Sequence, residues 1–331
     1  MLDYIVRRIF IGLVTILITT VIAFAIIQLP PGDFVTSYII RIEAMGGTVG
    51  ETQAAHLREI YGLDQPIYVQ YYRWMRNVVR GRFGYSFERQ RPVREVIGDR
   101  LGVTVVVSLA AVLLTWVLAV PIGIYSAVKQ YSIGDYIFTF LGFIGIAVPS
   151  FLLALVVMYV ALTQFGADVG GLYSTEYVHA PWSWAKFVDM LKHLPTAAIV
   201  LGIAGTATTI RVLRANLLDE LGKPYVITAR AKGLPEHRLI LKYPVRVALN
   251  PFVSTVGYLF PYIVSGSIIV SLVLALPTVG PILLMSLLAQ DMFLAGTIIL
   301  LLSVTTVIGT FLSDLLLVWL DPRIRTGGVS R

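Results

Sequence analysis

The apolar positions of this chain fall into six long runs that are separated by more polar segments. About 20 consecutive apolar residues are enough for a helix to cross the hydrocarbon layer of a membrane, so we treat each run as a candidate span. The runs cover residues 9–29, 103–128, 136–165, 195–211, 252–276 and 295–320. The pattern therefore predicts an all-α polytopic membrane protein with six transmembrane helices.

These runs divide the chain into three parts. Residues 1–29 form the N-terminus and the first span, residues 30–100 a polar insertion, and residues 101–331 a core with the other five spans. A basic loop at 212–250 separates the fourth span from the fifth. The first run is longer than the 7–15 apolar residues of a cleaved signal peptide, so we expect it to be retained.

Helical periodicity is also present in the insertion. It predicts helices at 51–61 and 66–79, after a flexible turn at Gly46-Gly47. The second of these helices is rich in aromatic residues, namely Tyr68, Tyr71, Tyr72 and Trp74. Such residues either pack the insertion onto the membrane interface or contact an external partner. The sequence leaves both readings open.

The basic loop sets the expected orientation. Eight Lys or Arg residues between positions 211 and 246 face only Asp219, Glu220 and Glu236. Short loops with such an excess lie on the cytoplasmic side, which places both termini inside the cell and the insertion in the periplasm. The ten Arg of the insertion do not contradict this, because loops beyond about 60 residues translocate largely regardless of charge.

Within the basic loop the pattern predicts two short helices. Leu217, Leu221, Tyr225 and Ala229 recur every four residues and are expected to line one helix face. Gly233 suits the end of that helix, and Pro235 suits the first position of the next. A helix, a break and a second helix can dock into a groove on a soluble partner. The candidate contact residues are Ala229, Arg230, Lys232, Gly233, Leu234 and Pro235.

Some residues inside the predicted spans are unusual for a membrane helix. Pro121, Pro149 and Pro261 indicate bent helices, either around a translocation path or as plain packing kinks. Asp314 is either a functional carboxylate or the partner of a basic side chain at the cytoplasmic rim. Small residues in the fourth run favour close helix–helix approach.

Composition agrees with a membrane protein. The chain has 331 residues, of which 57% are hydrophobic and only 14% charged, and its mean hydropathy is +0.80. Soluble domains carry about 25% charged residues. The net charge of +7 fits basic cytoplasmic flanks and anionic lipid better than nucleic acid, for which no recognition motif is present. The absence of cysteine excludes disulfides and thiolate ligands.

The chain lacks the common motifs of catalysis. No G-x-x-x-x-G-K-[S/T] phosphate loop occurs, and the nearest stretch has Glu51 where Lys is required. The sequence contains no G-x-S-x-G elbow and no His-Glu-x-x-His motif. The four His residues, His56, His179, His193 and His237, lack metal-ligand spacing. We therefore expect no catalysis, no metal and no cofactor in this chain alone.

Several short motifs occur in order along almost the whole chain. They are Met1-Leu2-Asp3-Tyr4, Leu29-Pro30-Pro31-Gly32-Asp33, Tyr61-Gly62-Leu63-Asp64, Gly84-Tyr85-Ser86, Thr228-Ala229-Arg230-Ala231-Lys232-Gly233-Leu234 and Asp321-Pro322-Arg323. Together they resemble the dipeptide/oligopeptide-type permease subunits of ATP-binding-cassette importers. The cytoplasmic signature of that superfamily begins Glu-Ala-Ala, whereas Ile227, Thr228 and Ala229 stand here. The missing Glu leaves the shape of the motif intact.

The resemblance implies a bacterial inner-membrane subunit that works by alternating access. It also implies four partners: a second, homologous permease, two cytoplasmic ATPases that hold ATP and Mg²⁺, and an external solute-binding protein. Peptides are the expected substrates, and members that carry oligosaccharides, nickel or glutathione are alternatives. Two other classes stay open. A stand-alone secondary carrier should show internal repeats and more ionisable residues at mid-membrane, and a membrane scaffold or receptor would not need the basic two-helix loop.

Overall fold

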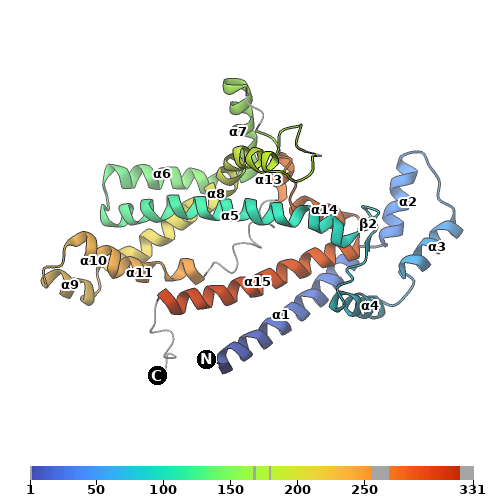
Figure 1. Ribbon diagram of the computed structural model, residues 1–331, viewed down its shortest axis with the longest axis horizontal. Coiled ribbons are helices and arrows are strands. Elements are labelled where there is room, and N and C mark those ends of the chain that lie inside the picture. Colours follow the sequence, from blue (N-terminus) through green and yellow to red (C-terminus); the bar gives the residue numbers. More distant parts are fainter. Residues whose placement is uncertain (1, 167–168, 179, 255–267, 321–331) are drawn as a thin grey trace. The chain divides into compact units, whose positions relative to one another are not determined.

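The computed structural model describes residues 2–166, 169–178, 180–254 and 268–320. Helices dominate these residues (Figure 1). The chain divides into two compact units, one formed by Met1–Thr104 with Thr278–Val307, the other by Val105–Pro277 with Ile308–Arg331. Each unit is described by itself.

The first unit contains the first predicted span and the polar insertion. Its elements are α1 (Leu2–Gln28), α2 (Phe34–Ala44), α3 (Glu51–Tyr61), α4 (Ile67–Val79), β1 (Tyr85–Ser86), β2 (Arg91–Pro92), the first turns of α5 (Val93–Val128), α14 (Val279–Leu288) and the first part of α15 (Met292–Leu320). The strands pair antiparallel, with Tyr85 opposite Pro92. Helices α3 and α4 occupy the predicted ranges, whereas α2 was not predicted.

One side chain defines the start of helix α2. Asp33 caps it by accepting a hydrogen bond from the Thr36 backbone N–H at 2.7 Å. The same carboxylate accepts from the Arg58 guanidinium of α3 at 2.6 Å. Asp33 thus ties α2 to α3.

Two apolar clusters hold the first unit together. The larger one joins the end of α1 to α4, α5, α14 and α15, and at its centre are the fully buried Trp74, Val93 and Leu294. The smaller one packs Phe34 of α2 against Phe87 of the strand loop, with ring centroids 4.9 Å apart. Both clusters place the insertion firmly on the membrane helices of this unit.

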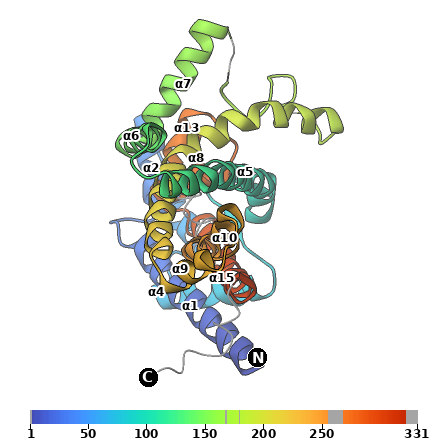
Figure 2. The ribbon, with the colours of Figure 1, turned by 90° about the vertical axis from the view of Figure 1, so that its left-hand side faces the viewer.

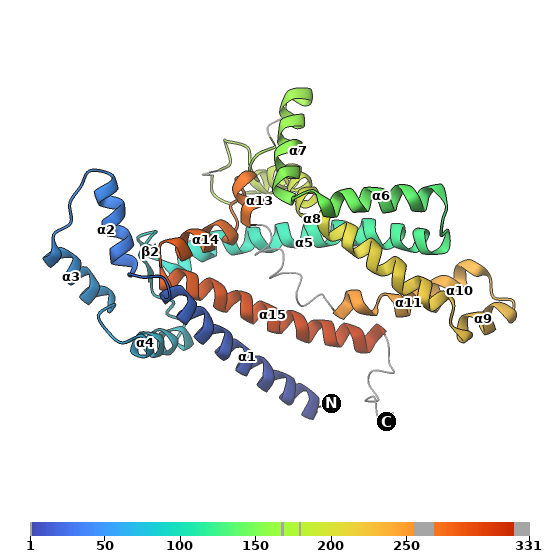
Figure 3. The same ribbon diagram turned by 180° about the vertical axis from the view of Figure 1, so that it is seen from behind.

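The regular elements described in the second unit are all helices. They are the rest of α5, α6 (Ile133–Ala147), α7 (Ser150–Phe165), α8 (Trp184–Leu221), α9 (Pro224–Ala231), α10 (Glu236–Lys242), α11 (Pro244–Ala248), α13 (Ile268–Val273) and the end of α15. Helix α8 packs against α6, α7 and α11, as Figure 3 shows from behind. Small residues allow α5 and α8 to approach closely, because a β-carbon on Gly202 would lie 3.2 Å from the Ala111 carbonyl oxygen.

The third predicted span, 136–165, is not one helix. It is broken into α6 and α7, which are bent by 104° (Figure 2). Pro149 causes the break, because the residue before a proline is pushed out of the helical region, and Val148 is indeed extended at ψ 122°. At 1.5 Å per residue each half is only about 22–24 Å long, less than the ~30 Å hydrocarbon layer.

The fourth predicted span, 195–211, is longer than predicted. Helix α8 begins at Trp184 and ends at Leu221, and it is bent by 51° between Ile203 and Gly205. The Gly202 carbonyl accepts hydrogen bonds from the hydroxyls of Thr206 (2.8 Å) and Thr115 (3.3 Å). Such side-chain bonding to a helix carbonyl bends helices.

Among the described residues, three helices are long and apolar enough to cross a membrane. They are α1, α5 and α15, and the number rises to five if each bent pair is one span. Residues 255–267 of the predicted span 252–276 lie outside the described part. The structure therefore shows a polytopic helical protein, and the count of six spans stays a prediction.

Candidate functional site

The basic loop is a chain of short helices that continues from α8. Helix α8 ends at Leu221 with Gly222 as its C-cap residue, α9 begins at Pro224, and α10 and α11 follow (Figure 3). The prediction that Leu217 and Ala229 share one helix face was wrong. Proline at 224 has no N–H to continue α8 and fits the first position of a new helix, so the periodic residues lie on two helices.

The predicted break at Gly233 is present and has a defined geometry. Gly233 adopts φ +77°, and its N–H donates to the Arg230 carbonyl at 3.0 Å. The Leu234 N–H donates to the Ala229 carbonyl at 3.5 Å. These two bonds are those of a Schellman motif, in which a left-handed residue closes the end of a helix. Pro235 precedes α10 as its N-cap residue rather than occupying the first helical position.

An ion pair bridges this break. The Arg230 guanidinium donates two hydrogen bonds to the Glu236 carboxylate, at 3.0 and 2.5 Å. The hydrogen bond from Arg230 lowers the pKa of Glu236, and the same bond raises the pKa of Arg230. Because both side chains are half exposed, we assign this pair to the shape of the turn rather than to stability.

Beneath the break, the helix pair α9–α10 is packed onto α8. Val226 of α9 and Leu239 of α10 are fully buried in one cluster with Leu213 and Leu217 of α8. Val245 of α11 closes the same cluster. A force applied to α9 and α10 is therefore transmitted to α8 through close apolar contacts.

The opposite face of the helix pair is exposed. Ile227 is 57% exposed, and the basic side chains Lys223, Lys232 and Arg238 are exposed as well. Of the candidate contact residues, only Ala229 and Leu234 are partly buried against the cluster, while Arg230, Lys232, Gly233 and Pro235 face solvent. The structure thus separates an anchoring face from a face that a partner can reach.

One further contact of α8 was not predicted. The Arg214 guanidinium donates to both carboxylate oxygens of Asp135 at 2.9 Å each, which joins α8 to the start of α6. Asp135 is buried and also accepts from the Tyr131 backbone N–H at 3.0 Å. The sequence signal was an Asp at the edge of an apolar run, but nothing in the sequence indicated its partner 79 residues away.

The three candidate prolines differ in their positions relative to the helices. Pro121 lies inside α5, which continues through it, and Pro149 breaks α6 from α7. Pro261 lies outside the described residues. Asp314 is partly buried within α15. No group of three or more His, Cys, Asp or Glu side chains with metal-binding geometry occurs among the described residues.

These features define an integral membrane protein with a basic helix pair built onto its helical core. Residues 119–326 match a family described as the binding-protein-dependent transport system inner membrane component. Residues 1–110 match the N-terminal family of the same systems. The chain belongs to this family of inner-membrane transport components, as the resemblance predicted.

Curated relatives match the chain over nearly its whole length. It is 33% identical to the oligopeptide transport system permease protein AppB of Bacillus subtilis, over 98% of this chain and 99% of the relative. It is 30% identical, with the same coverage, to the glutathione transport system permease protein GsiC of Salmonella typhimurium. Both similarities include the insertion and the helix pair α9–α10.

Proposed function

We propose that this chain is a transmembrane permease subunit of an ATP-driven importer that takes up di- and oligopeptides by alternating access. The observation that carries the proposal is the match to an oligopeptide permease over 98% of the chain. Glutathione is itself a tripeptide, so the similarity to a glutathione permease points to the same class of substrate.

The proposed assembly contains a second permease, two cytoplasmic ATPases and an external solute-binding protein. The exposure of large apolar side chains supports the proposal of partners in the membrane. Val117 of α5 is 68% exposed and Phe140 of α6 is 65% exposed, so lipid or another permease must cover them. The exposed face of α9–α10 supports a soluble partner, because short helices with apolar and basic side chains fit a groove.

In the proposed mechanism the ATPases press on α9 and α10. The buried contacts of Val226 and Leu239 pass that movement to α8, and the Arg214–Asp135 pair passes it to α6. ATP and loaded binding protein change the state of the spans only if both favour the same state. Peptide is then released to the side on which the spans open.

Reconstitution of the purified chain tests this proposal. Liposomes that contain the chain, its companion permease and the two ATPases should take up labelled peptide when ATP and the binding protein are present. Omission of the ATPases should abolish uptake. Uptake by the chain alone, driven by an ion gradient, would instead identify a secondary carrier and overturn the proposal.

A further inference from the structure

The two faces of α4 separate its aromatic residues into buried and exposed groups. Trp74 is buried, and the Tyr71 hydroxyl lies 3.0 Å from the Thr20 hydroxyl of α1. Tyr68 and Tyr72, by contrast, are 75% and 66% exposed. Only half of the aromatic set therefore serves to attach α4 to the helices of its unit.

Contacts with α1 place α4 at one end of a membrane helix. Gln70 accepts a hydrogen bond from Gln28, the last residue of α1, and Tyr71 reaches Thr20, which is eight residues earlier. At 1.5 Å per residue, the 27 residues of α1 are about 40 Å long, which matches a bilayer with its headgroups. The stretch from Thr20 to Gln28 covers about 12 Å of that length, so the contacts of α4 with α1 straddle the boundary between the headgroups and the hydrocarbon.

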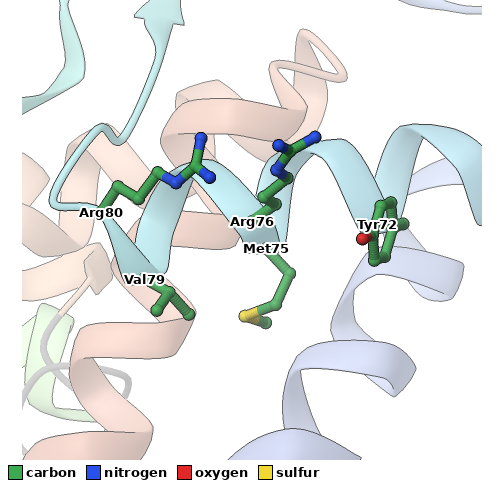
Figure 4. Close-up of a pocket in the computed structure, with 5 residues that line it drawn as sticks. All are labelled: Tyr72, Met75, Arg76, Val79 and Arg80. Carbon is green, nitrogen blue, oxygen red and sulfur yellow. The ribbon is translucent and has the colours of Figure 1, made fainter.

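The exposed face of α4 carries a shallow hollow of about 370 Å³. Figure 4 shows that Arg76 and Arg80 point to one side of the helix, and Met75 and Val79 to the other. Met75 packs against the apolar cluster that contains the end of α1, so this edge of α4 borders the buried part of its unit. The two guanidinium groups are directed away from Met75 and are exposed.

The charge on this face is uncompensated. Within the described part of the chain, neither Arg76 nor Arg80 has an acidic partner. Like charges four residues apart on a helix repel one another, and an anion held near both relieves that repulsion. Guanidinium groups bind phosphate with paired, directional hydrogen bonds.

We propose that α4 is an interfacial helix whose exposed face, formed by Tyr68, Tyr72, Arg76, Val79 and Arg80, binds the headgroup phosphates of membrane phospholipid. The tyrosine rings lie at the boundary between hydrocarbon and water, where such rings are favoured. An apolar side in the lipid and a basic side on the headgroups is the arrangement of known interfacial helices. The helix would thereby fix the level of the insertion on the membrane.

The experiment uses the absence of cysteine in this chain. One fluorescent label is attached to Val79→Cys. The control is the same label on Arg89→Cys, which lies on the exposed turn of the strand pair. The labelled subunit is assembled in vesicles of phosphatidylethanolamine and phosphatidylglycerol that contain headgroup-spin-labelled lipid. We expect a loss of fluorescence at position 79 that is clearly greater than the loss at position 89.

A charge-matched pair of variants tests the role of the guanidinium groups. In the Val79→Cys background, Arg76→Gln with Arg80→Gln should reduce quenching, whereas Arg89→Gln with Arg94→Gln should not. Equal quenching at 79 and 89, or equal effects of the two charge pairs, would overturn the proposal. Protection of position 79 that appears only after the external binding protein is added would assign the surface to a protein instead.

Discussion

At the scale of single residues, Gly233 sets the geometry of the helix pair. Its φ of +77° lies in the left-handed region, and no atom lies within 4 Å of the position that a β-carbon would take. Space therefore does not require glycine here, but the backbone conformation does. An L-residue pays about 1–2 kcal/mol in that region, a factor of about 5–30 in population.

We expect Gly233→Glu to lower peptide uptake while ATP hydrolysis by the assembled complex continues. Gly233→Asn should be milder, because Asn tolerates the left-handed region. Gly222→Ala is the matched control, since Gly222 has an ordinary φ of −82°. Uptake and ATP hydrolysis are measured together in proteoliposomes, and normal coupling in Gly233→Glu would contradict the role of this turn.

We expect the Asp33 carboxylate to make the stability of the fold depend on pH. Burial alone would raise its pKa, but hydrogen bonds from Arg58 and Thr36 outweigh burial and hold the pKa below the ordinary value of 3.8. A carboxyl whose pKa is lowered by folding stabilises the protein above its unfolded pKa, and that stabilisation is lost as the pH falls through the lower, folded value.

Asp33→Asn should therefore lower the melting temperature at pH 6, and the difference from the unaltered protein should shrink below about pH 4. Asparagine keeps the helix cap and loses only the charge, so the variant isolates the pairing with Arg58. Asp64→Asn is the control, because the Asp64 carboxylate is exposed and accepts a hydrogen bond from its neighbour Gln65. A difference between Asp33→Asn and the unaltered protein that stays constant from pH 6 to pH 3 would refute the assignment.

At the scale of elements, the candidate prolines Pro121 and Pro149 act differently although both lie in apolar runs. Pro121 lies in α5 without interrupting it, while Pro149 lies at the break between α6 and α7, where the chain bends by 104°. The difference arises at the preceding residue. Val148 is extended, so the helix ends there, whereas the residues before Pro121 remain helical.

We expect Pro149→Ala to reduce the angle between α6 and α7, because Val148 can then return to the helical region. Spin labels at the exposed positions Phe140 and Leu162 would move apart as the pair straightens. Pro121→Ala should leave that distance unchanged. An unaltered distance in Pro149→Ala would show that packing against α8, rather than proline, maintains the bend.

At the scale of the whole molecule, the central property is the position of the polar segments relative to the membrane. The charge pattern predicts the insertion outside and the basic helix pair inside. Both are anchored by buried side chains, Trp74 for the insertion and Val226 for α9. The side of the membrane on which each lies therefore decides which partners it can meet.

Single cysteines test this topology. A membrane-impermeant thiol reagent added to intact cells should label Thr48→Cys, in the loop between α2 and α3, and should leave Lys223→Cys unlabelled until the membrane is opened. Both side chains are exposed, so access depends on the side of the membrane. Labelling of Lys223→Cys in intact cells would reverse the predicted orientation.

The sequence by itself determined the features that depend on neighbouring residues. The length of an apolar run, the left-handed glycine at 233 and the helices at 51–61 and 66–79 are local, because propensity and periodicity act over a few residues. Where local signals competed, the prediction failed. The four-residue period across 217–229 concealed the helix end at Leu221 and the new start at Pro224.

Only the tertiary structure decided which residues meet across the chain. Asp135 and Arg214 lie 79 positions apart, and no periodicity links them. The aromatic residues of α4 all look alike in the sequence, yet Tyr71 and Trp74 turn toward α1 while Tyr68 and Tyr72 stay exposed. The physical reason is that packing selects one face of a helix through a partner helix, and that partner is absent from the local sequence.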